Sequence, residues 1–172
     1  MKIKNKMILP KNIEEIFYKA KKYYPELDNI SIKLKYTPLF YETMTATPSI
    51  YSFLFPWKKR SYVISINSGK QFGRYNVPIS SFNDSILLGW FGHELAHLIQ
   101  YEKMDWLEIM FLPYNFIFNQ QFRKKFELEA DKITKERGLE KELIKGIKFI
   151  LEDQRVNRLY KEKTKKYYSQ VS

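Results

Sequence analysis

The sequence predicts an α+β fold, with a small antiparallel or mixed sheet packed on one buried helix and followed by a helical C-terminal half. Segments within the first 80 positions alternate apolar and polar residues, as half-buried strands do. From residue 81 onward, apolar residues recur at helical spacing. The chain has 172 residues, a length that favours one domain. We therefore expect a single domain 1–172, with a helix and the sheet in 1–80 and helices in 81–172.

The N-terminal half begins with a predicted helix and continues with the segments of the sheet. Residues 12–24 place apolar side chains on one helical face, with Asn12 as the capping residue and Pro25 after the last turn. Three later segments have the residue pattern of strands, the second more weakly than the others: 30–36, 43–47 and 61–67. The aromatic run between Pro48 and Pro56 predicts a hydrophobic loop.

The C-terminal half is predicted to contain three helices. The first, from Asp84 to about residue 101, follows capping residues at 81–84 and is apolar nearly all round, which is typical of a buried helix. The second spans 120–137 and ends at Gly138 as a C-cap. The third covers 139 to about 160, and the tail beyond Lys161 is expected to fray.

The first of these helices carries both histidines of the protein, in the sequence His93-Glu94-Leu95-Ala96-His97. Residues four apart lie one above the other on a helix, so the two imidazoles can bind one metal ion. The glutamate beside them can act on the water that the metal activates. The H-E-x-x-H spacing therefore predicts a zinc site. The alternative is a buried, hydrogen-bonded stripe that binds no metal.

A catalytic zinc needs three protein ligands and an open fourth position. No other histidine and no cysteine exists in the chain, so the third ligand must be a carboxylate. The helix predicted at 120–137 offers Glu127 and Asp131, which are four residues apart and share a face. One can reach the metal, while the other can accept the free N–H of a ligand histidine. Glu129 points elsewhere and competes as a ligand, and the alternative is a solvated charged face paired with lysines.

The sequence H-E-L-A-H, followed after about thirty residues by E-L-E-A-D, resembles the gluzincin metallopeptidases. It is most similar to the heat-shock and CAAX-prenyl endopeptidases, whose second motif reads E-x-x-A-D, and the resemblance covers about 40 residues. It implies a zincin-like fold with one Zn²⁺ per chain, bound by His93, His97 and Glu127. It further implies that Glu94 is the general base and that Asp131 supports a ligand histidine. The chain looks like a minimal soluble version of that catalytic core.

The reaction that we expect is hydrolysis of a peptide or protein substrate. The metal activates a water molecule, and Glu94 takes its proton as general base. The oxyanion needs a further donor, a Tyr or an Arg, for which Arg155 and Arg158 are candidates. If 61–67 forms an exposed sheet edge, four of its residues can bind the substrate by strand addition: Tyr62, Val63, Ile64 and Ser65. The aromatic segments 50–57 and 106–118 can wall the cleft, form core or contact a membrane surface.

Composition limits the remaining choices. The absence of cysteine excludes disulfides and thiolate metal sites. Residues 1–12 lack the apolar core of a secretory signal, and the longest apolar stretch, 106–118, is too short to span a bilayer. We therefore expect a soluble, cytoplasmic protein. The net charge of +11 allows weak contact with nucleic acid or an anionic membrane surface, although scattered lysines also describe an ordinary solvated surface.

Two other functions remain open at this point. The first is a regulatory or binding module on a zincin fold that binds metal without efficient turnover. Such a module could act at a membrane surface or on nucleic acid. The second is a basic nucleic-acid-associated protein. The sequence contains neither a helix-turn-helix signal nor an aromatic-basic RNA-binding signature.

Overall fold

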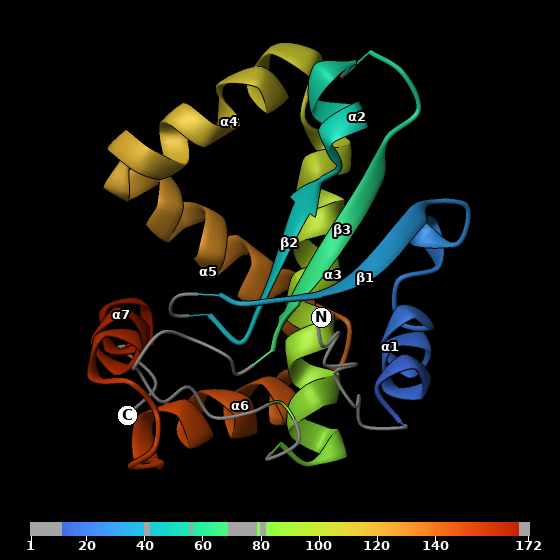
Figure 1. Cartoon of the computed structure of the whole chain (residues 1–172). Helices are drawn as coiled ribbons and strands as arrows, with labels where there is room; N and C mark the ends of the chain where they lie inside the picture. Colours follow the sequence, from blue (N-terminus) through green and yellow to red (C-terminus); the bar gives the residue numbers. More distant parts are fainter. Residues whose placement is uncertain (1–11, 40–41, 56, 69–78, 80–81, 169–172) are drawn as a thin grey trace, which may run out of the picture.

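A small sheet and one central helix organise the fold. The computed structural model describes residues 12–39, 42–55, 57–68, 79 and 82–168. In this part of the chain, a three-stranded sheet lies against α3 (Asp84–Lys103). Three further helices pack on other sides of α3: α1 (Ile13–Lys21), α5 (Gln120–Glu136) and α6 (Glu140–Glu152) (Figure 1). The predicted α+β class, with a sheet near the N-terminus and a helical C-terminal half, is thus confirmed.

The sheet is mixed and has the strand order β1-β3-β2. Its strands match the three segments predicted from alternation: β1 (Ser31–Thr37), β2 (Met44–Pro48) and β3 (Ser61–Asn67). The central strand β3 runs parallel to β1 and antiparallel to β2. Among the described residues, β2 is therefore paired on one side only, and it is also the strand that contacts α3 most.

The position of β3 corrects one prediction. The residues expected to form a substrate-binding edge are each paired with β1 on one side and β2 on the other: Tyr62, Val63, Ile64 and Ser65. A strand paired on both sides has no free row of N–H and C=O groups for a further chain. The burial of β3 agrees with its central position in the sheet. Tyr62 and Ile64 are buried on one face, and Val63 and Ser65 on the other face are only partly exposed. The predicted strand addition at β3 is therefore wrong.

Helix α1 forms as predicted, but its first residue does something else. Four side chains of its apolar face are buried: Ile13, Ile16, Phe17 and Ala20. Asn12 makes no capping hydrogen bond. Instead, its Nδ2 donates to Oδ1 of Asp84 over 2.6 Å and joins the start of α1 to the start of α3.

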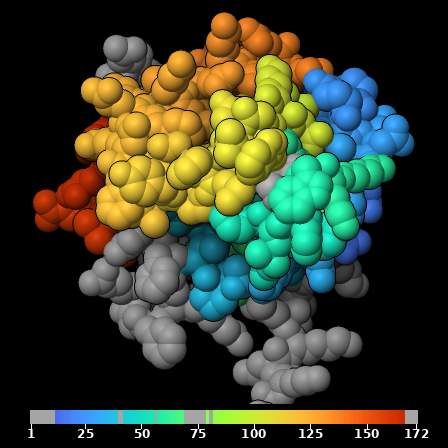
Figure 2. Space-filling view, turned by 90° about the horizontal axis from the view of Figure 1, so that it is seen from above, coloured from blue at the N-terminus to red at the C-terminus, as the bar shows by residue number. Residues whose placement is uncertain are grey.

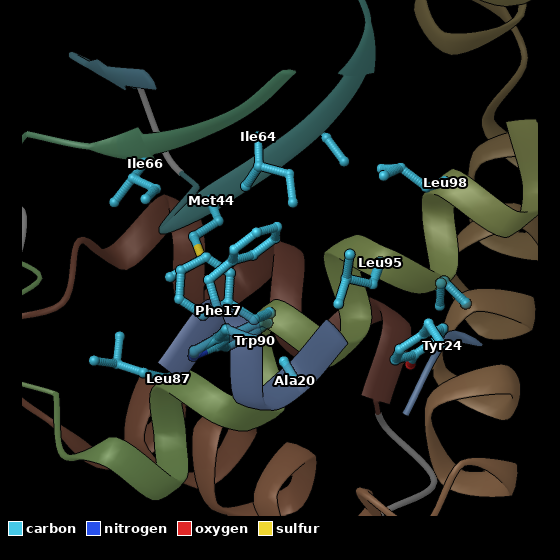
Figure 3. Packing of buried hydrophobic residues seen from close by; sticks show 14 of the residues in the cluster. Phe17, Ala20, Tyr24, Met44, Ile64, Ile66, Leu87, Trp90, Leu95 and Leu98 are labelled. Carbon is cyan, nitrogen blue, oxygen red and sulfur yellow. The ribbon is translucent and has the colours of Figure 1, made fainter. Parts of the chain in front are cut away.

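Helix α3 is buried along most of its length. Its N-cap is Asn83, whose side chain accepts a hydrogen bond from the backbone N–H of Ile86 at 2.9 Å. Every residue from Ile86 to Tyr101 is buried. The apolar residues of α3 share one core with the sheet and α1, and Figure 3 shows several of these partners: Met44, Ile64, Ile66, Phe17 and Ala20. His93, Glu94, His97 and Gln100, the polar residues in this stretch of α3, are thus buried among apolar neighbours.

Close approach of α6 explains one of the glycines of α3. A Cβ placed on Gly89 would lie 2.4 Å from the backbone carbonyl carbon of Glu142, at the start of α6. No side chain fits there, so the two helices contact each other through their backbones. The space beside Gly89, one turn before His93, is therefore filled by α6.

Two helices occur where the sequence did not predict them. Part of the expected loop forms α2 (Ile50–Leu54), which Ser49 caps by accepting from the N–H of Ser52. The aromatic segment forms α4 (Trp106–Phe118), with Pro113 inside it. Asp105 and Glu108 form a reciprocal capping box that stabilises the start of α4. No helix among the described residues has both the length and the hydropathy that crossing a bilayer requires.

The last predicted helix is divided in two. Its first part is α6, which ends at Glu152. A separate helix, α7, runs from Arg158 to Tyr168 and includes residues beyond Lys161 that were expected to fray. Side chains in the connection cause the break. The Asp153 carboxylate accepts from the backbone N–H of Arg155, and Asn157 accepts from the N–H of Leu159, each at 2.8 Å. Helix α5 ends as predicted, with Gly138 at φ 83°.

Candidate metal centre

Helices α3 and α5 bring together the three predicted metal ligands. The Nε2 atoms of His93 and His97 are 3.1 Å apart. The Glu127 Oε2 lies 3.2 Å from Nε2 of His93 and 3.7 Å from Nε2 of His97. A tetrahedral zinc site with bonds of about 2.0–2.1 Å spaces its ligand atoms about 3.3 Å apart. The triangle of donor atoms is therefore close to the size of a site for a single metal ion.

Both histidines present the same nitrogen to this triangle because their other nitrogen is engaged. Nδ1 of His93 lies 2.8 Å from Oδ1 of Asp131, the residue predicted for this contact. Nδ1 of His97 lies 2.8 Å from Oε1 of Gln100. An amide oxygen only accepts, so His97 carries its proton on Nδ1 and leaves the Nε2 lone pair directed at the triangle. The carboxylate of Asp131 favours the same tautomer of His93.

Gln100 also belongs to the site, although it was not predicted from the sequence. Its Nε2 donates to the backbone oxygen of Phe126 at 2.9 Å and to Oε2 of Glu129 at 3.1 Å, which fixes the orientation of the amide. The Phe126 ring also stacks on the His97 ring, with centroids 5.0 Å apart. Glu129, considered as a competing ligand, thus contacts Gln100 instead. The spacing of Gln100 could have predicted this role, because this residue lies one helical turn after His97 on α3 and can therefore reach the His97 ring.

The histidines and the carboxylates perturb each other's protonation. Burial alone would lower the pKa of His93, but the hydrogen bonds with Asp131 and Glu127 outweigh it and hold that pKa well above 6.5. Burial would raise the pKa of Glu127, yet its contacts with His93 and His97 hold it well below 4.5. These opposite shifts favour a proton on the His93 imidazole beside an ionised Glu127 carboxylate when no cation is bound. A divalent ion can take the place of that proton.

Glu94 lies beside the triangle in an unusual setting for a carboxylate. It is buried, and burial raises its pKa. The backbone N–H of Ala46, on β2, is its hydrogen-bonding neighbour. Among the described residues, no group satisfies its Oε2 atom. A buried, unsatisfied carboxylate oxygen costs free energy unless water or an ion completes its contacts, so this atom fits a site that binds both.

The site opens into a pocket of about 180 Å³. Trp90 and the two histidines form its floor on α3, Met44 and Thr45 of β2 border it, and α4 contributes Phe116. Helix α7 closes another side with three residues: Tyr160, Lys163 and Thr164. Tyr160 is held by Thr43, whose Oγ1 lies 3.3 Å from the phenol oxygen, and burial raises the pKa of this tyrosine.

The two arginines predicted to stabilise an oxyanion do not border this pocket. Arg155 pairs with Asp153 at 2.6 Å, and Arg158 pairs with Glu162 at 2.8 Å with 91% of its side chain exposed. The break between α6 and α7 is the reason, because it starts a new helix whose inward face carries Tyr160 rather than an arginine. The prediction for Arg155 and Arg158 is therefore wrong.

Comparison of the chain with protein-family models, curated proteins and solved structures gives no match. The likeness to zincins therefore rests on the two sequence motifs and on their geometry. His93, His97 and Glu127 form a largely buried triad whose ligand atoms lie within 4.8 Å of one another. This triad resembles a zincin-like site and makes a single metal ion plausible there.

Proposed function

We propose that this protein is a zinc-dependent peptidase of the gluzincin type. The observation that carries the proposal is the triangle of His93, His97 and Glu127 donor atoms, with the unsatisfied Glu94 oxygen at its side. Two neutral imidazoles and one carboxylate would leave net positive charge on a bound divalent ion. The chemistry that such an ion would supply is polarisation of a carbonyl oxygen and a lower pKa of a water molecule.

Glu94 acts as the proton carrier in this proposal. Its raised pKa, caused by burial, brings the carboxylate closer to the range in which a general base works at neutral pH. Its Oε2 accepts the proton of the attacking water and then delivers it to the amine that leaves. The Ala46 N–H holds the carboxylate in position through these steps.

Tyr160 replaces the arginines as the donor to the developing oxyanion. Its hydroxyl borders the pocket, and burial keeps it protonated. A neutral phenol is a hydrogen-bond donor that becomes more favourable as negative charge forms on the substrate oxygen. The Thr43 hydroxyl contacts the phenol oxygen, and the Thr164 hydroxyl donates to the backbone oxygen of Tyr160 one turn earlier in α7.

The edge of β2 is the place where an extended substrate fits. The backbone of Thr43 pairs with β3, so the backbone groups of Met44 and Ala46, which alternate with it, point away from β3. Those of Ala46 are engaged, because its oxygen accepts from the Tyr101 hydroxyl at 3.0 Å and its N–H faces Glu94. Pairing with a substrate would therefore use the backbone at Met44, directly beside the pocket.

The test compares Glu94→Gln with Glu127→Ala. We expect purified wild-type protein to contain about one zinc per chain by elemental analysis and to cleave members of a proteome-derived peptide library. Glu94→Gln keeps the metal and loses cleavage, whereas Glu127→Ala loses both. Unchanged turnover in Glu94→Gln would remove this carboxylate from the mechanism. Full metal content with no cleavage of any library peptide would favour a binding module instead.

A further inference from the structure

The exposed apolar side chains of the described residues are concentrated on one surface. Seventeen large hydrophobic residues are exposed, and thirteen of them lie in residues 50–55, 57 and 106–118. We call this surface, formed by α2, Phe55, Trp57 and α4, the apolar platform. Figure 1 shows α2 beside the start of α4, and the space-filling view in Figure 2 shows their atoms adjoining over one face. Such a concentration is rare on a free surface and marks a contact site.

Helix α4 is the main part of the platform, and little of it is needed by the fold. Only Ile109 and Leu112 are buried among its thirteen residues. Phe111, Ile117 and Phe118 are between 58% and 70% exposed. The single charged residue of α4, Glu108, is used in the capping box at its first turn. A helix that is apolar on its outer side as well as its inner side requires a second apolar environment.

The aromatic residues of the platform, and two lysines next to it in the sequence, indicate which environment this is. Trp57 and Trp106 are exposed, as are Tyr51 and Tyr114, and such amphipathic rings are enriched where a bilayer meets water. Lys58 and Lys59 are exposed next to them, with the Lys58 ammonium 5.2 Å from the ring centre of Phe55. The chain as a whole carries a charge of +11. An apolar surface bordered by lysines on a strongly cationic protein is complementary to an anionic lipid surface.

From these observations we propose that the apolar platform docks the protein on the surface of a membrane containing anionic lipids. With thirteen residues, α4 is about 20 Å long, which is shorter than the hydrocarbon core of a bilayer. It therefore lies in the interface with its outer side among the lipids. Phe116 borders the metal pocket from the same helix. Docking does not depend on the proposed peptidase activity, because the platform shares none of the metal-binding residues.

Intrinsic fluorescence can test docking directly with the full chain. Two of the three tryptophans, Trp57 and Trp106, belong to the platform, while Trp90 is buried in the core. Vesicles of phosphatidylcholine with about a quarter phosphatidylglycerol, in about 0.1 M salt, should shift the emission to shorter wavelength and sediment with the protein. Pure phosphatidylcholine vesicles should bind more weakly. The Lys58→Glu/Lys59→Glu variant should lose most of the preference for anionic vesicles.

A matched pair of variants separates the platform from hydrophobicity in general. Phe111→Ser/Ile117→Ser changes two exposed side chains of α4 and should weaken vesicle binding about a hundredfold. Tyr18→Ser/Leu159→Ser changes an exposed aromatic and an exposed aliphatic residue elsewhere and should bind as the wild type does. Circular dichroism checks that both variants are folded.

Two results would overturn the proposal. One is wild-type protein that neither sediments with anionic vesicles nor changes its emission. The other is equal weakening of binding by the two double variants, which would assign binding to nonspecific hydrophobic contact. A dimer in light scattering that Phe111→Ser/Ile117→Ser dissociates, with no vesicle binding by the wild type, would identify a second copy of the chain as the occupant.

Discussion

Gln100 Oε1 lies 2.8 Å from Nδ1 of His97 and accepts a hydrogen bond from it, so a neutral amide orients the second histidine of the H-E-x-x-H motif. His93 is oriented differently, by the carboxylate of Asp131. A carboxylate also raises the basicity of its histidine, whereas an amide mainly fixes the tautomer and the ring position. The two imidazoles are thus prepared for metal binding by chemically different partners.

We expect Gln100→Ala to weaken zinc affinity about 10–100-fold, because the His97 ring loses the contact that fixes its tautomer and position. Competition with a chromogenic chelator measures the affinity. Gln121→Ala, at an exposed position of α5, serves as the control and should bind zinc as tightly as the wild type. Equal affinities of Gln100→Ala and wild type would show that Gln100 has no role in the site.

Under the proposed function, Tyr160→Phe should lower kcat by roughly 10²–10³-fold with a small change in KM, because the phenol donates only once charge develops on the substrate. Steady-state hydrolysis of a library-derived peptide gives both constants. Zinc content should stay at the wild-type level, since Tyr160 borders the pocket outside the triad. A kcat equal to that of the wild type would exclude the tyrosine as the donor.

Gly89→Ala tests the contact between α3 and α6. Helix propensity alone would favour alanine by about 1 kcal/mol, but its Cβ would lie 2.4 Å from the Glu142 carbonyl carbon. Because backbone must move, we expect a net loss of about 1–3 kcal/mol in the free energy of unfolding, measured with urea. Gly92→Ala is the comparison, since its Cβ meets a side-chain methyl of Leu139 at 2.6 Å rather than backbone and should cost less. A Gly89→Ala protein at least as stable as Gly92→Ala would contradict this packing.

The raised pKa of Tyr24 predicts part of the loss of stability at alkaline pH. Its hydroxyl donates to the backbone oxygen of Gly92 on α3 at 2.8 Å, and burial raises its pKa from 10.0 to about 12. Between these values the unfolded chain releases the proton while the folded chain retains it, so stability falls as pH rises. We expect Tyr24→Phe to remove about 2 kcal/mol of this loss between pH 10 and pH 12. Parallel profiles of unfolding free energy against pH for variant and wild type would contradict this.

The parts of the site that could be predicted are those that depend on local spacing. His93 and His97 share a face because they are four residues apart on one helix, and the same holds for Glu127 and Asp131. The absence of other histidines and cysteines then left a carboxylate as the third ligand. The three strands were predictable for the same reason, since alternation is a property of neighbouring residues.

The parts that failed depend on contacts between distant residues. Alternation in 61–67 identifies a strand, but its place between β1 and β2 follows from pairings that no local pattern contains. Arg155 and Arg158 were misplaced because the side chains of Asp153 and Asn157 accept backbone hydrogen bonds between α6 and α7, where the predicted last helix is divided. The apolar residues of α4 could equally have belonged to a core, because hydrophobicity does not distinguish core from an exposed contact surface.

The origin of the triad in two helices has a consequence for biosynthesis. His97 leaves the ribosome thirty residues before Glu127, and Tyr160 follows thirty-three residues after Glu127. A nascent or truncated polypeptide that lacks α5 therefore lacks Glu127, and its two histidines alone do not complete the triad. If the centre is hydrolytic, unfinished chains would therefore be inactive until α5 has been synthesised and has packed against α3.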